Sequence, residues 1–519
     1  KKLWLKKKFV VETQWCIRVG CIPEAFHAEI AANDAQFDEW VKLLAIDEIQ
    51  GDLMKPGYSK QLTAAFLKGH PTLVVDTRHF DAGLTARLLE AIGDVDAQTD
   101  GVLFHSENFQ ALSLMQARYR EQVKCIYIDP PYNTGNDGFA YKDSYQHSSW
   151  AAMIFDRLDS GLSLQSPDGS IFVSLDDNEV TTFRSVATTV YGPNCFVAAC
   201  IWQKNYAPKS SARHFSEDHD YILVFAKESS DWTPVLLPRT DEQNAVYKNR
   251  DDDPRGPWRP NNLAARNYYS KGTFPITCPS GRVIPGPPSG SYWRVSEERF
   301  RAMDADGRIW WGEDGSNIPA PKIFLSEVKD GRVPQTLWLY KDVGHTQEAK
   351  KELIDLIAFA ASSDVFATPK PSRLIERILR LGMQPNNDLC CDYFAGSGTT
   401  GHAVINLNRE DGGQRKFILV EMGDHFDSVL LPRIKKVTFS PEWKDGKPKR
   451  LATPEEAERS PRIVKVVRLE SYEDTLNNLE TRRTDTQQLL LDTAQAQGAD
   501  GLKEQYLLRY LLEVETRGS

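Results

Sequence analysis

The sequence has few cysteines, and none of them is spaced like a zinc-ligand pair. Its 519 residues include eight Cys, with no CxxC pair; Cys16/Cys21 and Cys195/Cys200 share a wider gap and have no His or Cys partner at zinc-site spacing. This pattern disfavours a structural zinc site and, more generally, gives no reason to predict a metal centre. Free thiols of this kind are typical of a reducing compartment, so we predict a cytoplasmic protein.

The chain also lacks the marks of a membrane protein, a secreted protein or a strongly basic nucleic-acid-binding protein. No apolar run approaches the length of a membrane span, and the lysine-rich residues 1–8 contain no apolar core of a signal peptide. The formal net charge is −9, which removes any whole-molecule case for binding nucleic acid but leaves room for a local basic cleft.

What the chain does have is enough apolar sequence for an ordered, multidomain protein. Hydrophobic residues make up 41% of it and there are 12 Trp, which argues against a disordered chain. The length predicts roughly two to four domains. Because the sequence starts at Lys1 without a methionine and stops at Ser519 directly after a helical pattern, we expect it to be part of a longer polypeptide.

The most informative segment is Asp129-Pro130-Pro131-Tyr132, which follows the apolar run 125–128. It predicts a carboxylate, a rigid turn and an aromatic ring at the carboxyl end of a strand, where open α/β sheets bind ligands. There Asp129 and the Pro130 carbonyl can accept both hydrogens of a ring-conjugated amino group and free its lone pair, while Tyr132 stacks on the ring. The motif favours methyl transfer to an amine; taken alone, an ordinary exit from strand to loop explains it equally well.

A second buried strand, 389–394, runs into a glycine-rich turn and then a helical stretch, 401–407. Glycines at this turn let the backbone approach a ligand, and the helix N-terminus behind it supplies N–H groups. The next apolar strand ends in Glu421, 25 residues after Gly396, where a carboxylate can bind both ribose hydroxyls of an adenosine cofactor. No P-loop lysine follows the glycines, which disfavours a nucleoside triphosphate.

With both motifs identified, the chain resembles the β-class amino-methyltransferases that use S-adenosylmethionine, and among them the Mod (modification) subunits of type III restriction–modification systems. In the β class the target-amine motif precedes the cofactor motif, as it does here. The matching segments are VLFHSENF (102–109), YIDPPYNTG (127–135), GSIFVSLDDNE (169–179), HDYILVFAK (219–227), FATPKP (366–371) and DYFAGSGTT (392–400). One departure is Ser106-Glu107-Asn108, where the family more often has Gly-Asp-Asn.

The resemblance implies an α/β fold: a Rossmann-like class I S-adenosylmethionine-dependent methyltransferase sheet, circularly permuted, with an inserted target-recognition domain and terminal extensions. We place the N-terminal extension at 1–97, the catalytic half at 98–230, the recognition domain at 231–345, the cofactor half at 346–440 and the C-terminal extension at 441–519. The implied catalytic residues are Asp129, Pro130, Pro131 and Tyr132. The implied cofactor pocket is formed by Glu107, Asn108, Thr368, Lys370, Phe394, Gly396, Gly398 and Glu421.

The segment 231–345 breaks the alternating pattern of strands and helices because it is rich in Pro, Gly, Trp and Arg. Guanidinium groups can bind guanine or phosphate, so the arginines of this segment are candidates for contacting DNA, although for any one of them a surface salt bridge is the commoner role. These candidates are Arg255, Arg259, Arg266, Arg282 and Arg294.

Patterning elsewhere predicts further elements. We expect a helix over 37–46 and a strand over 72–76 in the N-terminal extension, and an antiparallel hairpin of strands 196–203 and 221–226 at one edge of the sheet. The C-terminal extension predicts a strand over 462–469 and helices over 472–496 and 502–516, the last with an apolar stripe that favours packing within the chain or against a partner.

The function implied by the resemblance is adenine-N6 methylation of double-stranded DNA, with base flipping, by the modification subunit of a restriction–modification or phage-defence system. The partners implied are a second copy of the chain and a helicase–nuclease subunit. Cytosine-N4 methylation is an alternative, but that group more often has Ser where Asp129 stands. A second alternative is a DNA-recognition and assembly platform of a defence complex whose methylation is conditional.

Overall fold

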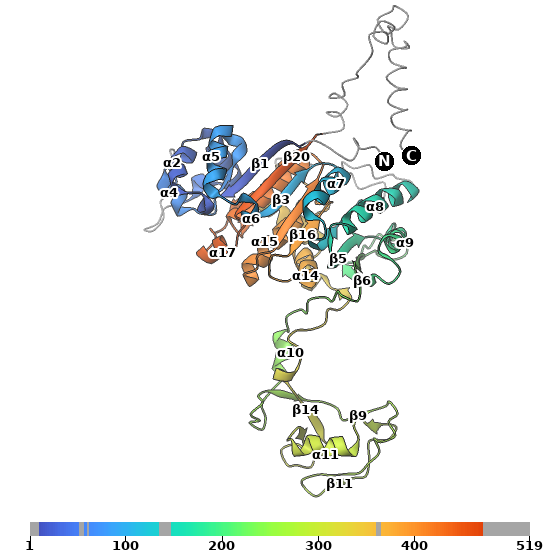
Figure 1. The fold of residues 1–519 in the computed structure, drawn as a ribbon. Helices are drawn as coiled ribbons and strands as arrows, with labels where there is room; N and C mark the ends of the chain where they lie inside the picture. Colours follow the sequence, from blue (N-terminus) through green and yellow to red (C-terminus); the bar gives the residue numbers. More distant parts are fainter. Residues whose placement is uncertain (1–9, 51–56, 60–61, 134–146, 360–364, 471–519) are drawn as a thin grey trace, which may run out of the picture. The chain divides into compact units, whose positions relative to one another are not determined.

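The computed structural model describes residues 10–50, 57–59, 62–133, 147–359 and 365–470, which form two units (Figure 1). The first combines Lys1–Val235 with Gln335–Ser519, and the second is Leu236–Pro334. None of the helices in the described ranges combines the length and the apolar character needed to cross a lipid bilayer. The helices predicted over 472–496 and 502–516 lie outside the described residues.

The first unit is built on a sheet of 11 described strands in the order β15-β6-β7-β5-β4-β16-β17-β3-β20-β1-β2. Neighbours from β5 to β20 pair in parallel, while β7 runs antiparallel between β5 and β6. The predicted α/β class with a mostly parallel sheet is confirmed. The central strands are β3 (Thr99–His105), β4 (Val123–Ile128), β5 (Gln165–Leu175), β6 (Phe196–Gln203), β7 (His219–Ala226), β16 (Leu389–Asp392) and β17 (Lys416–Glu421).

Strands from both ends of the chain extend this sheet beyond β3. β20 (Ile463–Leu469) pairs with β3, β1 (Val10–Arg18) pairs antiparallel with β20, and β2 (Val74–Asp76) pairs with β1. The patterning predicted β20 and β2 but missed β1. At the opposite edge the two-residue strand β15 (Leu337–Trp338) pairs with β6, so the chain returns to the sheet immediately after the second unit.

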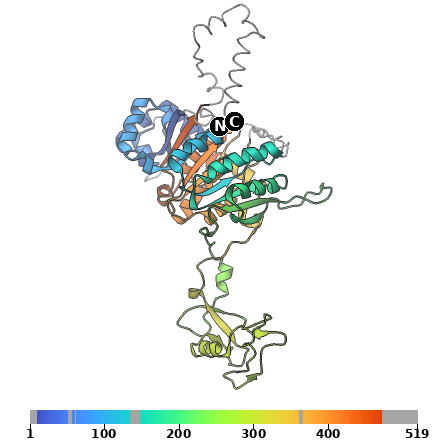
Figure 2. The ribbon, with the colours of Figure 1, turned by 45° about the vertical axis from the view of Figure 1, so that its right-hand side comes forward.

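Helices cover both faces of the sheet (Figures 1 and 2). α7 (Asn108–Tyr119), α8 (His147–Leu162) and α9 (Val180–Tyr191) pack in a row, and their apolar side chains share a core with Ile126 and Ile128 of β4. On the other face α14 (Ser372–Gly382) lies so close to β4 that a Cβ at Gly382 would come within 2.7 Å of the Cys125 sulfur. α15 (Thr399–Asp411) and α16 (Leu431–Phe439) continue that layer.

The N-terminal part of the first unit is a small helical layer beside β1 and β2. It contains α2 (His27–Ala31), α3 (Asp34–Leu44), α4 (Ala64–Gly69), α5 (Ala82–Ile92) and α6 (Val95–Gln98). Asn33 caps the N-terminus of α3, where its side chain accepts from the Gln36 N–H, and Ala45 follows the last helical residue in the left-handed conformation. The helix predicted over 37–46 therefore begins three residues earlier, at Asp34.

The second unit has its own small core around α11 (Glu297–Ala305) and short strands. β8 (Trp258–Pro260), β14 (Ala320–Phe324) and β13 (Ile309–Trp310) form one sheet, and two strand pairs complete the unit: β9 (Ala264–Ala265) with β12 (Tyr292–Trp293), and β10 (Ile276–Thr277) with β11 (Val283–Ile284). Its buried side chains include Leu263, Phe274, Ile276, Trp293 and Phe300. Because it buries its own apolar cluster, Leu236–Pro334 is a folded unit and not an extended loop.

Asp392, the last residue of β16, is a buried acid at the turn into α15. Its Oδ1 accepts from the backbone N–H of Phe394 at 3.0 Å, and its Oδ2 accepts from the Thr400 hydroxyl at 2.5 Å. These bonds stabilise the ionised form, but burial outweighs them and raises the pKa of Asp392 to about 7. The carboxyl group therefore holds its proton more tightly in the folded protein than in the unfolded chain.

We expect the contribution of Asp392 to the free energy of unfolding to fall as pH rises from about 4 to about 7, because over this range the folded state binds the Asp392 proton and the unfolded state does not. Asp392→Asn should remove this slope and gain stability relative to wild type as pH rises. Urea unfolding at about pH 5 and pH 8 measures the difference, with exposed Asp424→Asn as the matched control. If the free energies of unfolding of Asp392→Asn and wild type differ by the same amount at both pH values, the raised pKa of Asp392 is contradicted.

Candidate functional site

A cavity of about 410 Å³ lies along the carboxyl edge of the sheet, entirely within the first unit. Six adjacent strands contribute a charged residue to its lining, each at or next to the strand end at this edge. They are Glu421 of β17, Asp392 of β16, Asp129 after β4, Asp176 after β5, Asp220 of β7 and Lys204 after β6. The size is that of a small-molecule site, and the place is where open α/β folds bind ligands.

The four predicted catalytic residues all line this cavity. They follow β4 directly, and Trp150 of α8 donates to the Pro131 carbonyl at 2.8 Å, which fixes the turn from behind. The side chain of Asn133, the next residue, donates to buried Glu179 at 2.8 Å. The turn is therefore held on both sides before any ligand binds.

Lys370 pairs with Asp129, the carboxylate predicted to be catalytic. Its ammonium lies 2.5 Å from Asp129 Oδ2 and 5.1 Å from the centre of the Tyr132 ring. Asp129 Oδ1 is buried and makes no hydrogen bond within the described structure. Burial, followed by the carboxylates of Asp129 and Asp220, raises the pKa of Tyr132 well above its usual value, so this ring is a neutral phenol. One oxygen of Asp129 is thus anchored by Lys370, and the other has no hydrogen-bond partner among the described residues.

The glycine-rich turn and Glu421 form the other half of the lining. Gly396 adopts a φ of +51°, and its N–H donates to Glu421 Oε2 at 2.8 Å. Glu421 Oε1 accepts from the N–H groups of Met422 and Gly423, each at 2.8 Å. These three bonds orient a buried carboxylate, and the His425 imidazole lies 3.3 Å from its Oε2.

Not every predicted cofactor residue lies in the cavity. Thr368, Lys370, Phe394, Gly396 and Glu421 line it, whereas Glu107, Asn108 and Gly398 do not. Gly398 precedes α15 with a φ of +79°, where a Cβ would come within 3.1 Å of Leu430. Its role in the structure is to make the turn.

Glu107 and Asn108 are engaged with the ends of other elements. Glu107 caps α7 by accepting from the N–H groups of Phe109 and Gln110, and it also pairs with Arg157. Asn108 donates to the Tyr393 carbonyl at 3.0 Å and accepts from Arg157 at 3.0 Å. Their assignment to the cofactor stays a prediction, and the contacts present are those of a brace between α7, α8 and β16.

Sequence reasoning missed the charged residues at the far end of the cavity. Lys204 donates to Asp220 Oδ1 at 2.6 Å. Asp176 follows β5, the strand between β7 and β4, and lines the same cavity. Burial raises the pKa of Asp220, while Lys204 and then Lys370 oppose the shift. The available signal was the position of Asp176 and Asp220 inside two segments of the family resemblance, 169–179 and 219–227, which gave no indication of their role.

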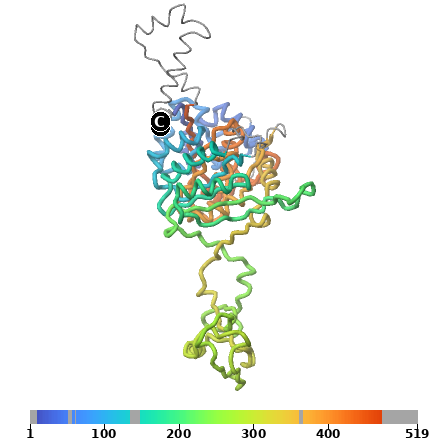
Figure 3. The backbone as a smooth tube through the Cα atoms, turned by 90° about the vertical axis from the view of Figure 1, so that its right-hand side faces the viewer, coloured from blue at the N-terminus to red at the C-terminus, as the bar shows by residue number. Residues whose placement is uncertain are grey.

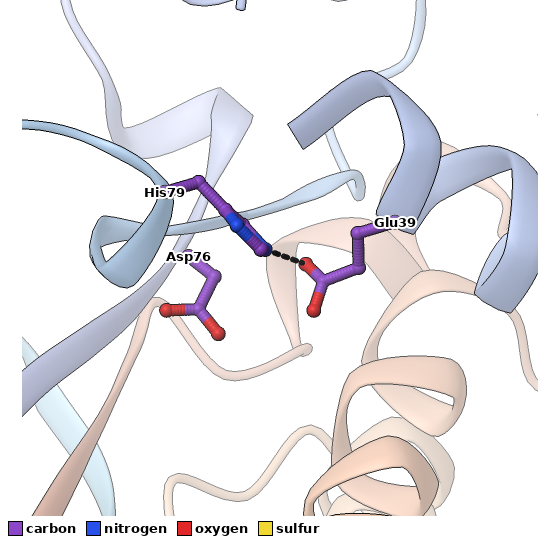
Figure 4. A group of neighbouring side chains, drawn as sticks. All are labelled: Glu39, Asp76 and His79. Carbon is purple, nitrogen blue, oxygen red and sulfur yellow. Dashed lines mark ion pairs between the residues drawn. The ribbon is translucent and has the colours of Figure 1, made fainter. Parts of the chain in front are cut away.

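Among the described residues, one cluster has the composition of a metal site. Atoms of Glu39, Asp76 and His79 lie within 4.8 Å of one another, and His79 Nε2 is 3.4 Å from Glu39 Oε2 (Figure 4). Lys435 Nζ, however, lies 2.6 Å from Glu39 and 2.5 Å from Asp76, and Arg78 pairs with both carboxylates as well. Two fixed cations already neutralise these acids, so the cluster is an ion-pair network that joins α3 and β2 to α16.

The candidate DNA-contacting arginines belong to the second unit. Arg255 pairs with Asp253 and Asp306 and lies over the Phe324 ring, and Arg259 donates to the Tyr247 hydroxyl at 3.1 Å. Arg282 is exposed and donates to the Ser316 carbonyl, while Arg266 and Arg294 are exposed. The first two arginines stabilise the unit itself, and a role in DNA binding stays a prediction for all five.

The chain is similar in sequence to known proteins. A family profile described as DNA methylase, for N6 and N4 methyltransferases, matches residues 123–283 and 291–429. The type III restriction-modification enzyme StyLTI Mod subunit of Salmonella typhimurium is 30% identical over 421 residues, which cover 74% of this chain and 60% of that protein. The EcoPI Mod subunit of Escherichia phage P1 is 29% identical over 380 residues, covering 62% and 57%. The chain thus spans less than two thirds of the length of these relatives.

Two solved structures also align with the chain. The M1.HpyAVI–SAM complex aligns with a TM-score of 0.31 at 14% identity, covering 64% of this chain and 99% of that one. The cytosine-N4-specific PvuII DNA methyltransferase aligns with a TM-score of 0.33 at 12% identity, covering 65% and 86%. The resemblance to Mod subunits predicted from the sequence is confirmed by the relatives. Since the family profile matches more than half of the chain and includes both motifs of the cavity, this chain belongs to the DNA methylase family of amino-methyltransferases.

Proposed function

We propose that the chain is an S-adenosylmethionine-dependent DNA methyltransferase that modifies the N6 atom of a flipped-out adenine, as the modification subunit of a type III-like system. One observation carries this proposal: a single cavity joins the glycine-rich turn and Glu421 to the Asp129-Pro130-Pro131-Tyr132 turn. A methyl donor at one end and an amine at the other would therefore share one enclosed space.

The residues at the glycine end fit the cofactor. Glu421 presents a buried, oriented carboxylate to ribose hydroxyls. Thr399 and Thr400 in the first turn of α15, a helix without a side-chain cap, line the same cavity and can offer backbone N–H groups to a ligand. At Gly396 a Cβ would come within 3.0 Å of the Phe366 ring, so glycine keeps this cradle open. When bound, S-adenosylmethionine supplies an electrophilic methyl group on a sulfonium.

The residues at the other end act on the amine. Asp129 Oδ1 and the Pro130 carbonyl accept its two hydrogens and free the nitrogen lone pair, and Tyr132 supports the ring of the base. Lys370 holds the second oxygen of Asp129, so the carboxylate enters the reaction in a fixed orientation. After the C–N bond forms, the nitrogen releases one proton, for which Asp129 is the acceptor.

Removing the ribose acceptor should weaken cofactor binding. Glu421→Gln keeps the shape but turns an NH₂ group towards the Gly396 N–H and loses one acceptor, so we expect the dissociation constant for S-adenosylmethionine to rise about tenfold to a hundredfold. Isothermal titration calorimetry measures this. Glu410→Gln, an exposed acid on α15 that pairs with Arg380 outside the cavity, is the matched control and should bind normally. Equal affinities for both variants would reject Glu421 as a cofactor residue.

Removing either member of the Asp129–Lys370 pair should slow methyl transfer and spare the cofactor. We expect Asp129→Ala to lower kcat by roughly 10² or more, and Lys370→Met to lower it in the same direction, with the S-adenosylmethionine dissociation constant within a few-fold of wild type. The double variant should be no slower than Asp129→Ala, because the two side chains act as one unit. A Lys370→Met protein that loses cofactor affinity instead would return Lys370 to the cofactor role predicted from the sequence.

Recognition of the DNA sequence is proposed for the second unit, Leu236–Pro334. It buries its own core and contributes no residue to the cavity, so it can vary without altering the catalytic groups. Exchanging this unit for that of a related protein should change which sequence is methylated and leave cofactor binding intact. Sequencing of modified bases measures the first and calorimetry the second. An unaltered methylation pattern in an active chimaera would place recognition elsewhere in the chain.

The partners follow from the relatives' names and the resemblance. Double-stranded DNA is the proposed substrate, a second copy and a helicase–nuclease subunit are the proposed protein partners, and the cytoplasm is the proposed location. The decisive experiment expresses the full-length protein in cells that lack DNA methylation and analyses their nucleosides by mass spectrometry. N6-methyladenine at one defined sequence is the expected result; N4-methylcytosine would support the alternative target, and no methylated base would overturn the proposal.

A further inference from the structure

We propose that Lys204 and Asp220 form the far wall of the subsite for the target base, where Lys204 donates a hydrogen bond to a ring nitrogen that flanks the reacting amino group. Asp220 is a positioning residue that acts through Lys204. This inference rests on the proposed function and names a contact that favours a base with an acceptor nitrogen beside its amino group.

The position of the pair along the sheet supports this assignment. The strand order places β16 and β17, with the cofactor residues, on one side of β4, and β5, β7 and β6 on the other. Asp129 follows β4, so a base whose amine lies at Asp129 extends over β5 and β7 if the cofactor occupies the β16 side. Lys204 and Asp220 line the cavity at this end. Tyr132 lines the same cavity as Lys204 and Asp220, so the two walls face one space.

Lys204 is rigidly placed for a surface-loop lysine. It follows β6 at the start of the segment joining β6 to β7, which is green in Figures 2 and 3 and extends away from the sheet. Its backbone N–H donates to the Asp218 carbonyl at 2.9 Å, and its carbonyl accepts from the Thr346 N–H at 3.1 Å. Asp220 is the cross-strand partner of Trp202, two residues before Lys204, so the ladder itself brings the ion pair together.

The burial of the Lys204–Asp220 pair favours a role in binding a ligand over a role in stability alone. The Asp220 side chain is 4% exposed and that of Lys204 is 22% exposed. Withdrawing such a pair from water has a desolvation cost that a similarly sized apolar pair would avoid, so the ion pair is a weak device for stability alone. An ammonium carries three donor hydrogens and no acceptor, so Lys204 can bond Asp220 and still donate to a ligand.

The chemistry of the bases matches a donor at this place. Adenine has acceptor nitrogens N1 and N7 on either side of its 6-amino group, and cytosine has the acceptor N3 beside its 4-amino group. Thymine lacks the amino group and carries a hydrogen on N3, which would oppose an ammonium. A donor-only lysine opposite a carboxylate–carbonyl pair for the amine therefore selects an amino group with an acceptor next to it.

The test pairs a change in the protein with a change of one atom in the DNA. Once the methylated sequence is known, oligonucleotides carry adenine, 1-deazaadenine or 7-deazaadenine at the target, and kcat/KM is measured for wild type and Lys204→Met. On adenine we expect Lys204→Met to lose about tenfold to a hundredfold, the size of a charge-assisted hydrogen bond. On the analogue that lacks the bonded nitrogen, wild type and variant should be alike, and the analogue that shows this identifies N1 or N7.

Controls separate the base contact from charge and folding. Arg213→Met removes one positive charge from the same segment, outside the cavity, and should change kcat/KM by the same factor on all three oligonucleotides. Asp220→Asn should repeat the selective pattern of Lys204→Met, and calorimetry should show S-adenosylmethionine affinity within a few-fold of wild type for both. Losses by Lys204→Met that are equal on all three bases would overturn the inference. A wild-type protein that methylates no DNA would instead overturn the proposed function.

Discussion

The pairing of β16 between β4 and β17 is the interaction on which the site depends. In the chain, β4 is separated from these two strands by β5, β6, β7 and the whole of the second unit. Parallel hydrogen bonding nevertheless sets the carboxyl ends of the three strands side by side. Asp129, Gly396 and Glu421 then meet at one edge of the sheet. Order along the sheet, and not order along the chain, decides what shares the cavity, which is why a permuted sequence can build the same site as an unpermuted one.

Charged side chains are distributed along the whole length of that edge. The cavity is lined by carboxylates from β17 to β7, and its two paired lysines, Lys370 and Lys204, each lie against one of them. Lys370 leaves Asp129 Oδ1 without a hydrogen bond, and Glu421 is oriented by three backbone N–H groups. Polar groups fixed before binding need little reorganisation when charge develops on a ligand, which is what the proposed methyl transfer requires.

Neither addition to the sheet contributes a residue to the cavity lining. The second unit is inserted in the chain between β7 and β15, and it buries its aromatic core within itself. The N-terminal helices join the other end of the sheet through β1 and β2 and through the ion-pair network of Lys435 with Glu39 and Asp76. Both additions can therefore carry functions of their own while the cavity keeps its catalytic lining.

The sequence by itself determined the fold class and the two motifs, because strand periodicity, glycine-rich turns and a carboxylate after a strand are local patterns. It predicted β4, β16 and β17 and most of the residues around them. Only the tertiary structure decided that Lys370 contacts Asp129, that Glu107 and Asn108 brace α7 against Arg157, and that Lys204 and Asp220 reach the same cavity. These contacts join residues far apart in the chain, and no local pattern encodes which distant side chain will fill the space beside a given strand end.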